Sequence, residues 1–310
     1  MSNDRTVLFV GSKRIGLEAL KALSRSVGGR VKAVVTADDA ADERSILPQF
    51  QSHCAAAKLP LSVLHKSSDL KAVVAAQRPH VVVVVGWYWI LPPELLAMAP
   101  GGFVGVHGSL LPRYRGQAPL VWAILRGETQ AGATMFYFDD GMDTGDIVDQ
   151  RTVPIGPEDS IAEVLAAVQE QTIDMVATHA QGLLEGTAPR RRQNALEATY
   201  GSLRRPEDGR IDWSASALEV HNFIRAQSRP YPGAFTTLGD GRELRIWRAS
   251  VFPMPYYGIA GLVAQPFDGG IVVLCGQGAI IVRDCQTADG QSGPGDLLKW
   301  GARLGGSAPA

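Results

Sequence analysis

The first half of the chain alternates short apolar runs with stretches of helical periodicity. Five apolar runs lie between turn or helix signals, at residues 6–10, 31–36, 60–64, 81–85 and 102–106. After the first of them, residues 15–23 repeat apolar positions at the spacing of an amphipathic helix. Strands that are apolar on both faces and separated by helices are typical of a parallel sheet covered on both sides. We therefore predict an α/β fold with a mostly parallel sheet and helices on both faces.

A longer helix and a change of character follow. Residues 160–181 form the clearest helical pattern, because Ser160 and Glu163 match a capping box ahead of regularly spaced apolar positions. We expect this helix to cover one face of the sheet. Residues 187–205 then hold five arginines against one acid and show weak periodicity, which is typical of a basic linker.

Short strands dominate the rest of the chain. One short helix is predicted at residues 215–225. Beyond it, apolar runs separated by Gly, Pro and Asp favour a small β-barrel, with strands at 243–249, 258–264, 270–275 and 279–284. We divide the chain into a first domain at residues 1–186, the linker at 187–205, a second domain at 206–303 and a disordered tail at 304–310.

Composition narrows the class of protein without naming its function. A length of 310 residues with 45% hydrophobic residues exceeds one ordinary core, so two domains are expected. The longest apolar run is far below the roughly 18–20 residues of a membrane span, and the first residues lack the features of a secretory signal, so we expect a cytoplasmic protein without membrane contact. Three scattered cysteines fit a reducing compartment and form no zinc motif. A formal net charge of −1 gives no global reason to bind nucleic acid.

Two polar segments are candidates for chemistry. Residues 106–119 (VHGSLLPRYRGQAP) leave a predicted strand, so His107 lies where open α/β sheets bind ligands. Residues 138–147 (FDDGMDTGDI) place four acids in a loop with glycines. A structural histidine and a solvated or calcium-like loop are the plain alternatives, but the loop lacks the ligand rhythm of an EF-hand, and we predict no metal. A carboxylate of this loop that orients His107 would form a general acid–base or oxyanion-stabilising pair.

The segments after the first two strands carry weaker signals. Residues 11–16 (GSKRIG) lack the P-loop ending and the three-glycine dinucleotide pattern. They are interpreted as a strand–helix turn, with contact of Lys13 or backbone amides to an anionic ligand as the alternative. The acid-rich stretch that follows the second strand is interpreted as a solvated loop or helix start, and its acids are Asp38, Asp39, Asp42 and Glu43.

The two polar segments together resemble the 10-formyltetrahydrofolate-dependent formyltransferase family, through HGSLLPRYRG followed by DTGD 36 positions after the histidine. Residues 210–235 (RIDWSASALEVHNFIRAQSRPYPGAF) are similar to the opening of the second domain in methionyl-tRNA and aminoarabinose-type sugar-nucleotide formyltransferases. The likeness covers nearly the whole chain. It implies a Rossmann-like catalytic domain followed by an OB-like barrel, and a one-carbon transferase whose formyl donor is 10-formyltetrahydrofolate.

In that family an asparagine, a histidine and an aspartate surround the formyl carbon. His107 matches the histidine and Asp143 the aspartate, whereas the asparagine position, two residues before the histidine, is Gly105. None of the three asparagines of the chain lies near the predicted strand. Loss of one such donor costs roughly 10²–10³ in rate when nothing replaces it. The alternatives are a transferase with a substituted donor, a slow or altered transferase, and a folate binder that has lost its chemistry.

The resemblance also implies where folate and substrate bind. One wall of the folate site is expected at Gly86, Trp87, Ile90 and Leu91, with core packing as the alternative for Trp87 and Ile90. The pteridine side is expected at Phe138, Asp139, Asp140 and Gly141. Candidates for substrate contact are Ser109, Arg113 and Arg115, of which an arginine could hold a phosphate, although shaping the turn is their simpler role.

The acceptor is expected to be a small primary amine. The tRNA enzymes of the family carry a basic insertion after the second strand, where this chain has ADDAADERSI, and tRNA binding demands several Lys and Arg contacts to phosphate. We therefore favour an amino sugar carried on a nucleotide. The alternatives are methionyl-tRNA, a hydroxyornithine-like amine, a formyltetrahydrofolate hydrolase and a non-catalytic folate binder. The oligomeric state, including a homodimer, stays open.

Overall fold

The computed structural model describes residues 5–40, 42 and 44–305, which divide into two compact units. The first unit comprises residues up to 116, 132–152 and 167–200, and the second comprises 117–131, 153–166 and the residues from 201 onward. The chain therefore passes between the units several times. The segment predicted as a linker, 187–205, holds only the last of these passages.

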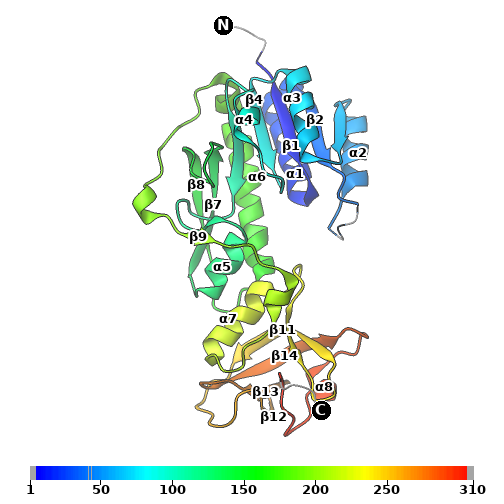
Figure 1. The fold of residues 1–310 in the computed structure, drawn as a ribbon, viewed down its shortest axis with the longest axis vertical. Helices are drawn as coiled ribbons and strands as arrows, with labels where there is room; N and C mark the ends of the chain where they lie inside the picture. The colour runs from blue at the N-terminus through cyan, green and yellow to red at the C-terminus, as the bar shows by residue number, and fades with distance from the viewer. Residues whose placement is uncertain (1–4, 41, 43, 306–310) are drawn as a thin grey trace. The chain divides into compact units, whose positions relative to one another are not determined.

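A seven-stranded sheet forms the centre of the first unit (Figure 1). Its strand order is β3-β2-β1-β4-β5-β7-β8, with parallel pairs from β3 to β5 and an antiparallel pair between β5 and β7. This arrangement confirms the predicted mostly parallel sheet. The strands are β1 (Val7–Gly11), β2 (Val31–Ala37), β3 (Leu61–Leu64), β4 (Val81–Val85), β5 (Phe103–His107), β7 (Gln130–Tyr137) and β8 (Ile147–Pro154).

Helices and short turns connect these strands. The α-helices are α1 (Lys13–Val27), α2 (Leu47–Ala56), α3 (Leu70–Gln77), α4 (Pro93–Leu96), α5 (Pro119–Leu125) and α6 (Ile161–Glu185). Single 3₁₀ turns form at η1 (Gly28–Arg30), η2 (Ser67–Asp69) and η3 (Ala195–Glu197), and a two-stranded ladder joins β6 (Arg115–Gly116) to β9 (Tyr200–Gly201).

The local sequence explains the central strands and the longest helix. Strands β1 and β4 are buried along their whole length, because one face packs on α3 and α4 while α1 contacts the same strands. A strand without polar residues can be buried on both of its faces, as these two strands are. At the start of α6 the backbone N–H of Ser160 donates to Glu163 Oε2 at 2.9 Å, which is one half of the predicted capping box. Figure 1 shows α6 running alongside the sheet.

The second unit is built on a five-stranded antiparallel sheet of order β10-β11-β14-β13-β12. The predicted short helix is α7 (Ala217–Gln227), which packs against β10, β11 and β14. The antiparallel strands are thus confirmed, and closure into an OB-like barrel stays a prediction. The other elements are η4 (Pro206–Gly209), β10 (Ala234–Thr237), β11 (Glu243–Val251), β12 (Val263–Phe267), β13 (Gly270–Leu274), β14 (Ala279–Thr287) and α8 (Pro294–Leu297).

Two expectations for the second half of the chain need correction. The strand predicted at 258–264 begins only at Val263, because Gly261 adopts φ +80° and ends a turn-rich stretch. Leu304, placed in the expected tail, is 3% exposed and belongs to the core of the second unit, and its N–H bonds the Gly261 carbonyl at 2.8 Å. Residues 306–310 of that tail lie outside the described residues. Within the described part of the chain, every helix is too short or too polar to cross a membrane.

Candidate active site

His107 is the last residue of β5 and lies largely buried at its carboxyl end. Its side chain is 11% exposed. Nε2 lies 2.8 Å from the carbonyl oxygen of Tyr114, and because a carbonyl can only accept, Nε2 carries a proton and donates it. Nδ1 lies 3.7 Å from Oδ2 of Asp143, which is beyond hydrogen-bond distance. The backbone therefore fixes one ring nitrogen, and the other faces the carboxylate.

Asp143 reaches His107 because its loop folds back along β5. The loop leaves β7 beside Phe103, whose carbonyl accepts the N–H of Phe138 at 2.9 Å. The Phe138 ring lies against Gly105, and further along the loop Asp143 lies beside His107. Asp143 itself adopts φ +54°, a left-handed conformation that aspartate tolerates better than most residues. Its Oδ2 accepts the N–H of Gly116 at 2.7 Å. The structure thus brings the two predicted catalytic residues together.

A glutamine that the sequence did not suggest holds this loop. Nε2 of Gln193 donates to the carbonyl oxygens of Asp143 and Gly145, both at 2.8 Å. Its Oε1 accepts from Nε and Nη2 of Arg115, at 3.2 and 2.7 Å. Gln193 lies in the segment predicted as a linker. Residues 187–200 of that segment are therefore part of the first unit, and no local sequence pattern indicated this.

The turn after His107 is closed by its own polar groups. Arg115 is 3% exposed, and besides Gln193 it donates to the hydroxyl of Tyr200 at 3.1 Å. Ser109 is 4% exposed and donates to the carbonyl of Arg113 at 2.6 Å. The structure therefore favours the loop-shaping role for Ser109 and Arg115 over substrate contact. Of the three candidates for substrate contact, only the Arg113 side chain is exposed.

The expected folate wall begins at Gly86, directly after β4. Gly86 adopts φ +69°, and a Cβ there would lie 2.4 Å from the carbonyl oxygen of Ser12, so only glycine fits. The Gly86 carbonyl accepts the Ser12 hydroxyl at 2.6 Å. This contact ties the loops after β1 and β4, the two neighbouring strands from which the chain continues in opposite directions along the sheet. Ligands of open α/β sheets bind at such a point.

The rest of that wall is aromatic and apolar. Trp87 and Leu91 pack against the core beneath β4, whereas Ile90 is 87% exposed. The Nε1 atom of Trp87 is buried and has no acceptor among the described residues. On the opposite loop, Asp139 Oδ1 accepts from the Thr144 hydroxyl at 2.6 Å and from Gly141 N–H at 3.2 Å, so it holds the turn, while Asp140 and Gly141 are exposed.

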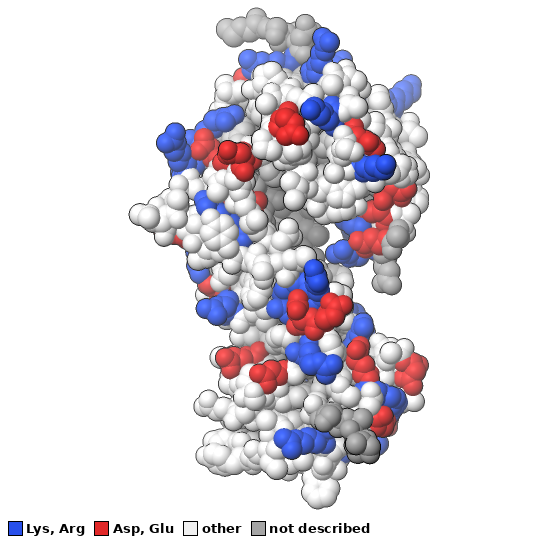
Figure 2. Space-filling model, viewed as in Figure 1, with Lys and Arg blue, Asp and Glu red and all other residues white. Residues whose placement is uncertain are grey.

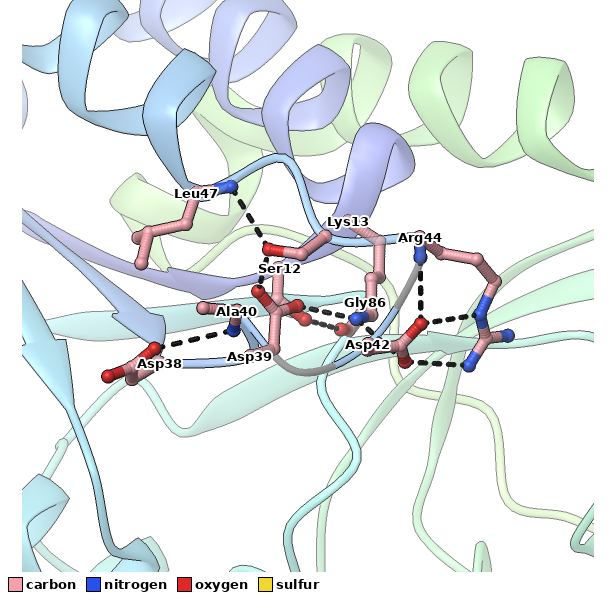
Figure 3. A network of polar contacts seen from close by, with 10 residues as sticks. Ser12, Lys13, Asp38, Asp39, Ala40, Asp42, Arg44, Leu47 and Gly86 are labelled. Carbon is pink, nitrogen blue, oxygen red and sulfur yellow. Dashed lines mark hydrogen bonds and ion pairs between the residues drawn. The ribbon is translucent and has the colours of Figure 1, made fainter.

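Lys13 and the acidic loop form a compact ionic network (Figure 3). Lys13 Nζ lies 2.5 Å from Oδ2 of Asp39 and 2.9 Å from Oδ2 of Asp42, and Asp39 is only 8% exposed. Burial opposes the charge on Lys13, but hydrogen bonds to both aspartates outweigh it and raise the pKa of Lys13. Hydrogen bonds from the Arg44 side chain, from Lys13 and from the Arg44 backbone N–H hold the pKa of Asp42 well below its usual range. The stretch was expected to be solvated, but Asp39 and Asp42 are held in place by their ion pairs with Lys13. Glu43 lies outside the described residues.

The asparagine position of the expected triad is closed. Gly105 is buried within β5, and a Cβ built on it would lie 2.6 and 2.7 Å from two ring carbons of Phe138. No side chain fits there while the ring stays in place. The remaining polar groups can orient a reacting group through His107 and accept a proton at Asp143. Among the described residues, no group of three or more His, Cys, Asp or Glu side chains could hold a metal ion.

Comparison with known proteins identifies this arrangement. The family model described as formyl transferase matches residues 5–178, and the model of the formyl transferase C-terminal domain matches residues 204–298. The chain belongs to the formyl transferase family. It is a formyl-transferring enzyme, as the motifs around His107 and Asp143 predicted. Methionyl-tRNA formyltransferase of Desulforamulus reducens is 33% identical over 90% of this chain and 89% of its own, and that of Geobacter sulfurreducens is 32% identical over 96% of both.

Solved structures of formyltransferases share the fold. WlaRD, a sugar 3N-formyltransferase determined with dTDP and 5-N-formyl-THF, superposes with a TM-score of 0.67 at 17% identity over 94% of this chain and 100% of its own. The N-formyltransferase of Helicobacter canadensis, in complex with folinic acid and dTDP-3-aminofucose, gives 0.66 at 19% identity over 90% and 98%. Both of these structures hold a folate ligand.

Proposed function

We propose that this formyltransferase moves the formyl group of 10-formyltetrahydrofolate to the primary amine of a small substrate, with an amino sugar carried on a nucleotide as the favoured acceptor. The pairing of His107 with Asp143 at the end of β5 carries the proposal. Because the two side chains do not hydrogen-bond to each other directly, Nδ1 of His107 and the carboxylate of Asp143 are available to reacting groups.

The reaction needs a donor for the developing oxyanion and a base for the amine. The uncharged amine attacks the formyl carbon, a new C–N bond forms, and the carbonyl electron pair moves to oxygen. His107, protonated at Nδ1, donates to that oxygen while Tyr114 holds Nε2. Asp143 takes the proton that the amine loses, directly or through water. When the intermediate collapses, the bond to the folate nitrogen breaks, and that nitrogen receives the proton.

The loops beside the site suit a flat, partly apolar donor. Tyr88 and Ile90 from the loop after β4, and Met142 from the loop after β7, are apolar side chains that are 52%, 87% and 60% exposed. Ligand pockets are lined mainly by apolar and aromatic side chains. The Trp87 indole N–H supplies a buried donor that lacks an acceptor among the described residues. These features support a pterin in the predicted position.

The charge around the acidic loop supports a small acceptor. Lys13, the first residue of α1, is neutralised by Asp39 and Asp42, so this lysine offers little free positive charge to a polynucleotide. On the face shown in Figure 2, basic and acidic side chains alternate within each unit instead of forming a continuous basic field. A nucleotide sugar needs few phosphate contacts, whereas tRNA needs several.

Methionyl-tRNA is the second candidate acceptor. It is favoured by the relatives, since proteins named methionyl-tRNA formyltransferase match more than 85% of this chain at 32–33% identity. The exposed arginines at 190–192 are among the basic residues of the first unit that could meet phosphates, although the Arg190 guanidinium already lies 3.5 Å from the centre of the Tyr137 ring.

An acceptor panel separates the candidates. Purified protein is incubated with 10-formyltetrahydrofolate and, in separate reactions, with nucleotide-linked amino sugars, hydroxyornithine and charged initiator tRNA. Formylated product is followed by mass spectrometry, with the His107→Ala variant as the control for the site. We expect product on an amino-sugar nucleotide that disappears in this variant.

Three other results would change the conclusion. Product on tRNA alone would contradict the interpretation that the acidic loop disfavours a tRNA acceptor. Release of formate without any amine would indicate a hydrolase. Folate binding without turnover on any acceptor would indicate a protein that keeps the fold and has lost the reaction.

A further inference from the structure

Position 105 in β5 is sterically closed from two directions. Phe138 Cε2 and Cζ lie 2.6 and 2.7 Å from the point where a Cβ would stand, and the backbone carbonyl oxygen of Val84 lies 3.0 Å from it. Real Cβ atoms essentially never approach other atoms to less than 3.0 Å. The contact with Val84 demands a shift of a few tenths of an ångström, whereas the contact with the ring demands that Phe138 move.

Phe138 is not free to move. Its N–H is bonded to the Phe103 carbonyl at 2.9 Å, and its ring centre lies 5.0 Å from that of Phe136 in a tilted arrangement. The ring packs against the core beneath β4 and β5 and also against the small cluster of Leu111, Phe136 and Ile147. It therefore joins two apolar clusters, and displacing it would open both.

The placement follows from sheet geometry. Gly105 pairs with Phe136 across the antiparallel β5–β7 ladder, so Phe138 is its diagonal neighbour. A glycine in a strand leaves bare backbone and weakens the strand, and an aromatic ring from the neighbouring strand can cover it. The glycine and the ring thus compensate for each other.

We propose that Gly105 and Phe138 form a matched pair, in which the Phe138 ring occupies the volume of the side chain that position 105 lacks. His107 is consequently the single side-chain hydrogen-bond donor of strand β5, whose sequence is FVGVH. Phe138 acts as a positioning residue, because it fixes the shape of the surface next to His107 and keeps a second donor out. The effect on rate rests on the proposed formyl transfer, whereas the packing does not.

A double-mutant cycle tests the pair. The variants are Gly105→Asn, Phe138→Ala and the double variant, with Gly105→Ala and Gly105→Ala/Phe138→Ala as controls that add a Cβ without an amide. Thermal midpoints report the packing. We expect Gly105→Asn and Gly105→Ala each to lower the midpoint by roughly 4–10 °C, because both overpack a buried site. In the Phe138→Ala background the same changes should cost clearly less, so the two positions couple.

Activity of the same variants tests the consequence for catalysis. Gly105→Asn alone should lose transfer activity, because its side chain displaces the ring. Gly105→Asn/Phe138→Ala should exceed Gly105→Ala/Phe138→Ala by at least about tenfold, since an oxyanion donor is worth roughly 10²–10³ in rate. Because only the amide distinguishes these two double variants, a merely structural effect would not separate them.

Contrary results are equally clear. Additive midpoint losses in the cycle, or a Gly105→Asn variant that folds as well as wild type and gains activity, would overturn the pair. If Phe138→Ala does not fold, the cycle is repeated with Phe138→Leu and Gly105→Ala. The test is again whether the losses in thermal midpoint of the single variants add up in the double variant. Coupled midpoints in proteins that show no turnover with any acceptor would support the pair and refute the proposed function.

Discussion

Two of the histidine–aspartate pairs in the first unit are built differently. His179 Nε2 lies 3.0 Å from Asp149 Oδ2, which also lies 3.1 Å from Nε of Arg151. His107 Nδ1 lies 3.7 Å from Asp143 Oδ2, and that oxygen accepts a backbone N–H instead. In the first, closed pair the imidazole bonds the carboxylate directly, whereas in the second, open pair the ring nitrogen that faces the carboxylate lies too far from it for a hydrogen bond.

The supporting elements account for the difference. Asp149 lies in strand β8 and His179 in helix α6, so regular structure holds both. His107 ends a strand, and Asp143 lies in a loop with left-handed backbone geometry. Backbone strain of this kind persists where the surrounding structure enforces it, and it clusters at functional sites. We therefore expect the closed pair, between regular elements, to stabilise the fold and the open pair, at a strand end, to serve the proposed reaction.

Replacing the two histidines should separate these roles most strongly. We expect His107→Ala to lower kcat by roughly 10²–10⁴-fold, because it removes the proton donor for the formyl oxygen. His179→Ala should keep wild-type kcat and lower only the thermal midpoint. Steady-state kinetics and thermal unfolding of both variants check this. An equal loss of rate in the two variants would erase the distinction between the pairs.

Replacing the aspartate should lower kcat in the open pair and leave it unchanged in the closed pair, with a smaller loss than replacing the histidine. Asp143→Asn keeps the size and the tolerance for left-handed geometry but loses the base, so kcat should fall by roughly 10²-fold. Asp149→Asn is the matched control and should leave kcat unchanged. Unchanged turnover in Asp143→Asn, measured at saturating donor and acceptor, would remove that carboxylate from the mechanism.

Loosening the loop that carries Asp143 should weaken the open pair without removing it. Gln193→Leu deletes the donors to the Asp143 and Gly145 carbonyls, so kcat should fall and KM for the folate should rise, each by roughly tenfold, through misplacement of the carboxylate. Gln181→Leu, which removes a glutamine bonded only to Glu185 of the same helix, is the control. A Gln193→Leu variant with wild-type kcat and KM would show that the loop holds its position unaided.

The smallest expected effect is the pH dependence of thermal stability that the closed pair, Asp149 with His179, contributes. Burial raises the pKa of Asp149, but hydrogen bonds from His179, the Gln150 backbone and Arg151 outweigh it, and the net pKa is lowered. A lowered pKa adds stability that is present above the unfolded value of about 4 and is lost as pH falls through the folded value. Asp149→Asn should therefore lose roughly 1 kcal/mol of unfolding free energy at pH 6. Its thermal midpoint should then lie about 2–4 °C below that of wild type.

Thermal unfolding between pH 3 and 7 measures that gap. It should stay constant above about pH 5 and shrink toward pH 3, because the wild-type carboxylate then takes up a proton. A gap that widens in acid would mean that Asp149 does not hold its charge through His179 and Arg151.

Much of the fold was predictable because its signals are local. The runs at 81–85 and 102–106 became β4 and β5, and the Ser160 and Glu163 pattern became the start of α6. The strand at 258–264 was misplaced because the glycine turn before Val263 extends further than hydrophobicity suggests. The start of the tail was wrong for a similar reason, since a single leucine gives no periodic signal.

The candidate site shows where sequence information ends. The proximity of His107 and Asp143 was predictable, because motif and strand end coincide at the first and the family pattern marks the second. Gln193 was not, since it bonds residues 48 and 50 positions earlier from a segment that looked like a linker. Asp39 was misjudged as solvated, because nothing local reveals that Lys13 lies against it.

The sequence by itself determined the order of strands and helices, the family, and the absence of a side chain at position 105. Periodicity, capping and turn chemistry act over a few residues, so they can be recognised along the chain. Only the tertiary structure decided what fills that position, which carbonyls Gln193 holds and how far apart His107 and Asp143 stand. These features depend on contacts between residues 33, 50 and 36 positions apart, and packing of the whole unit sets such contacts.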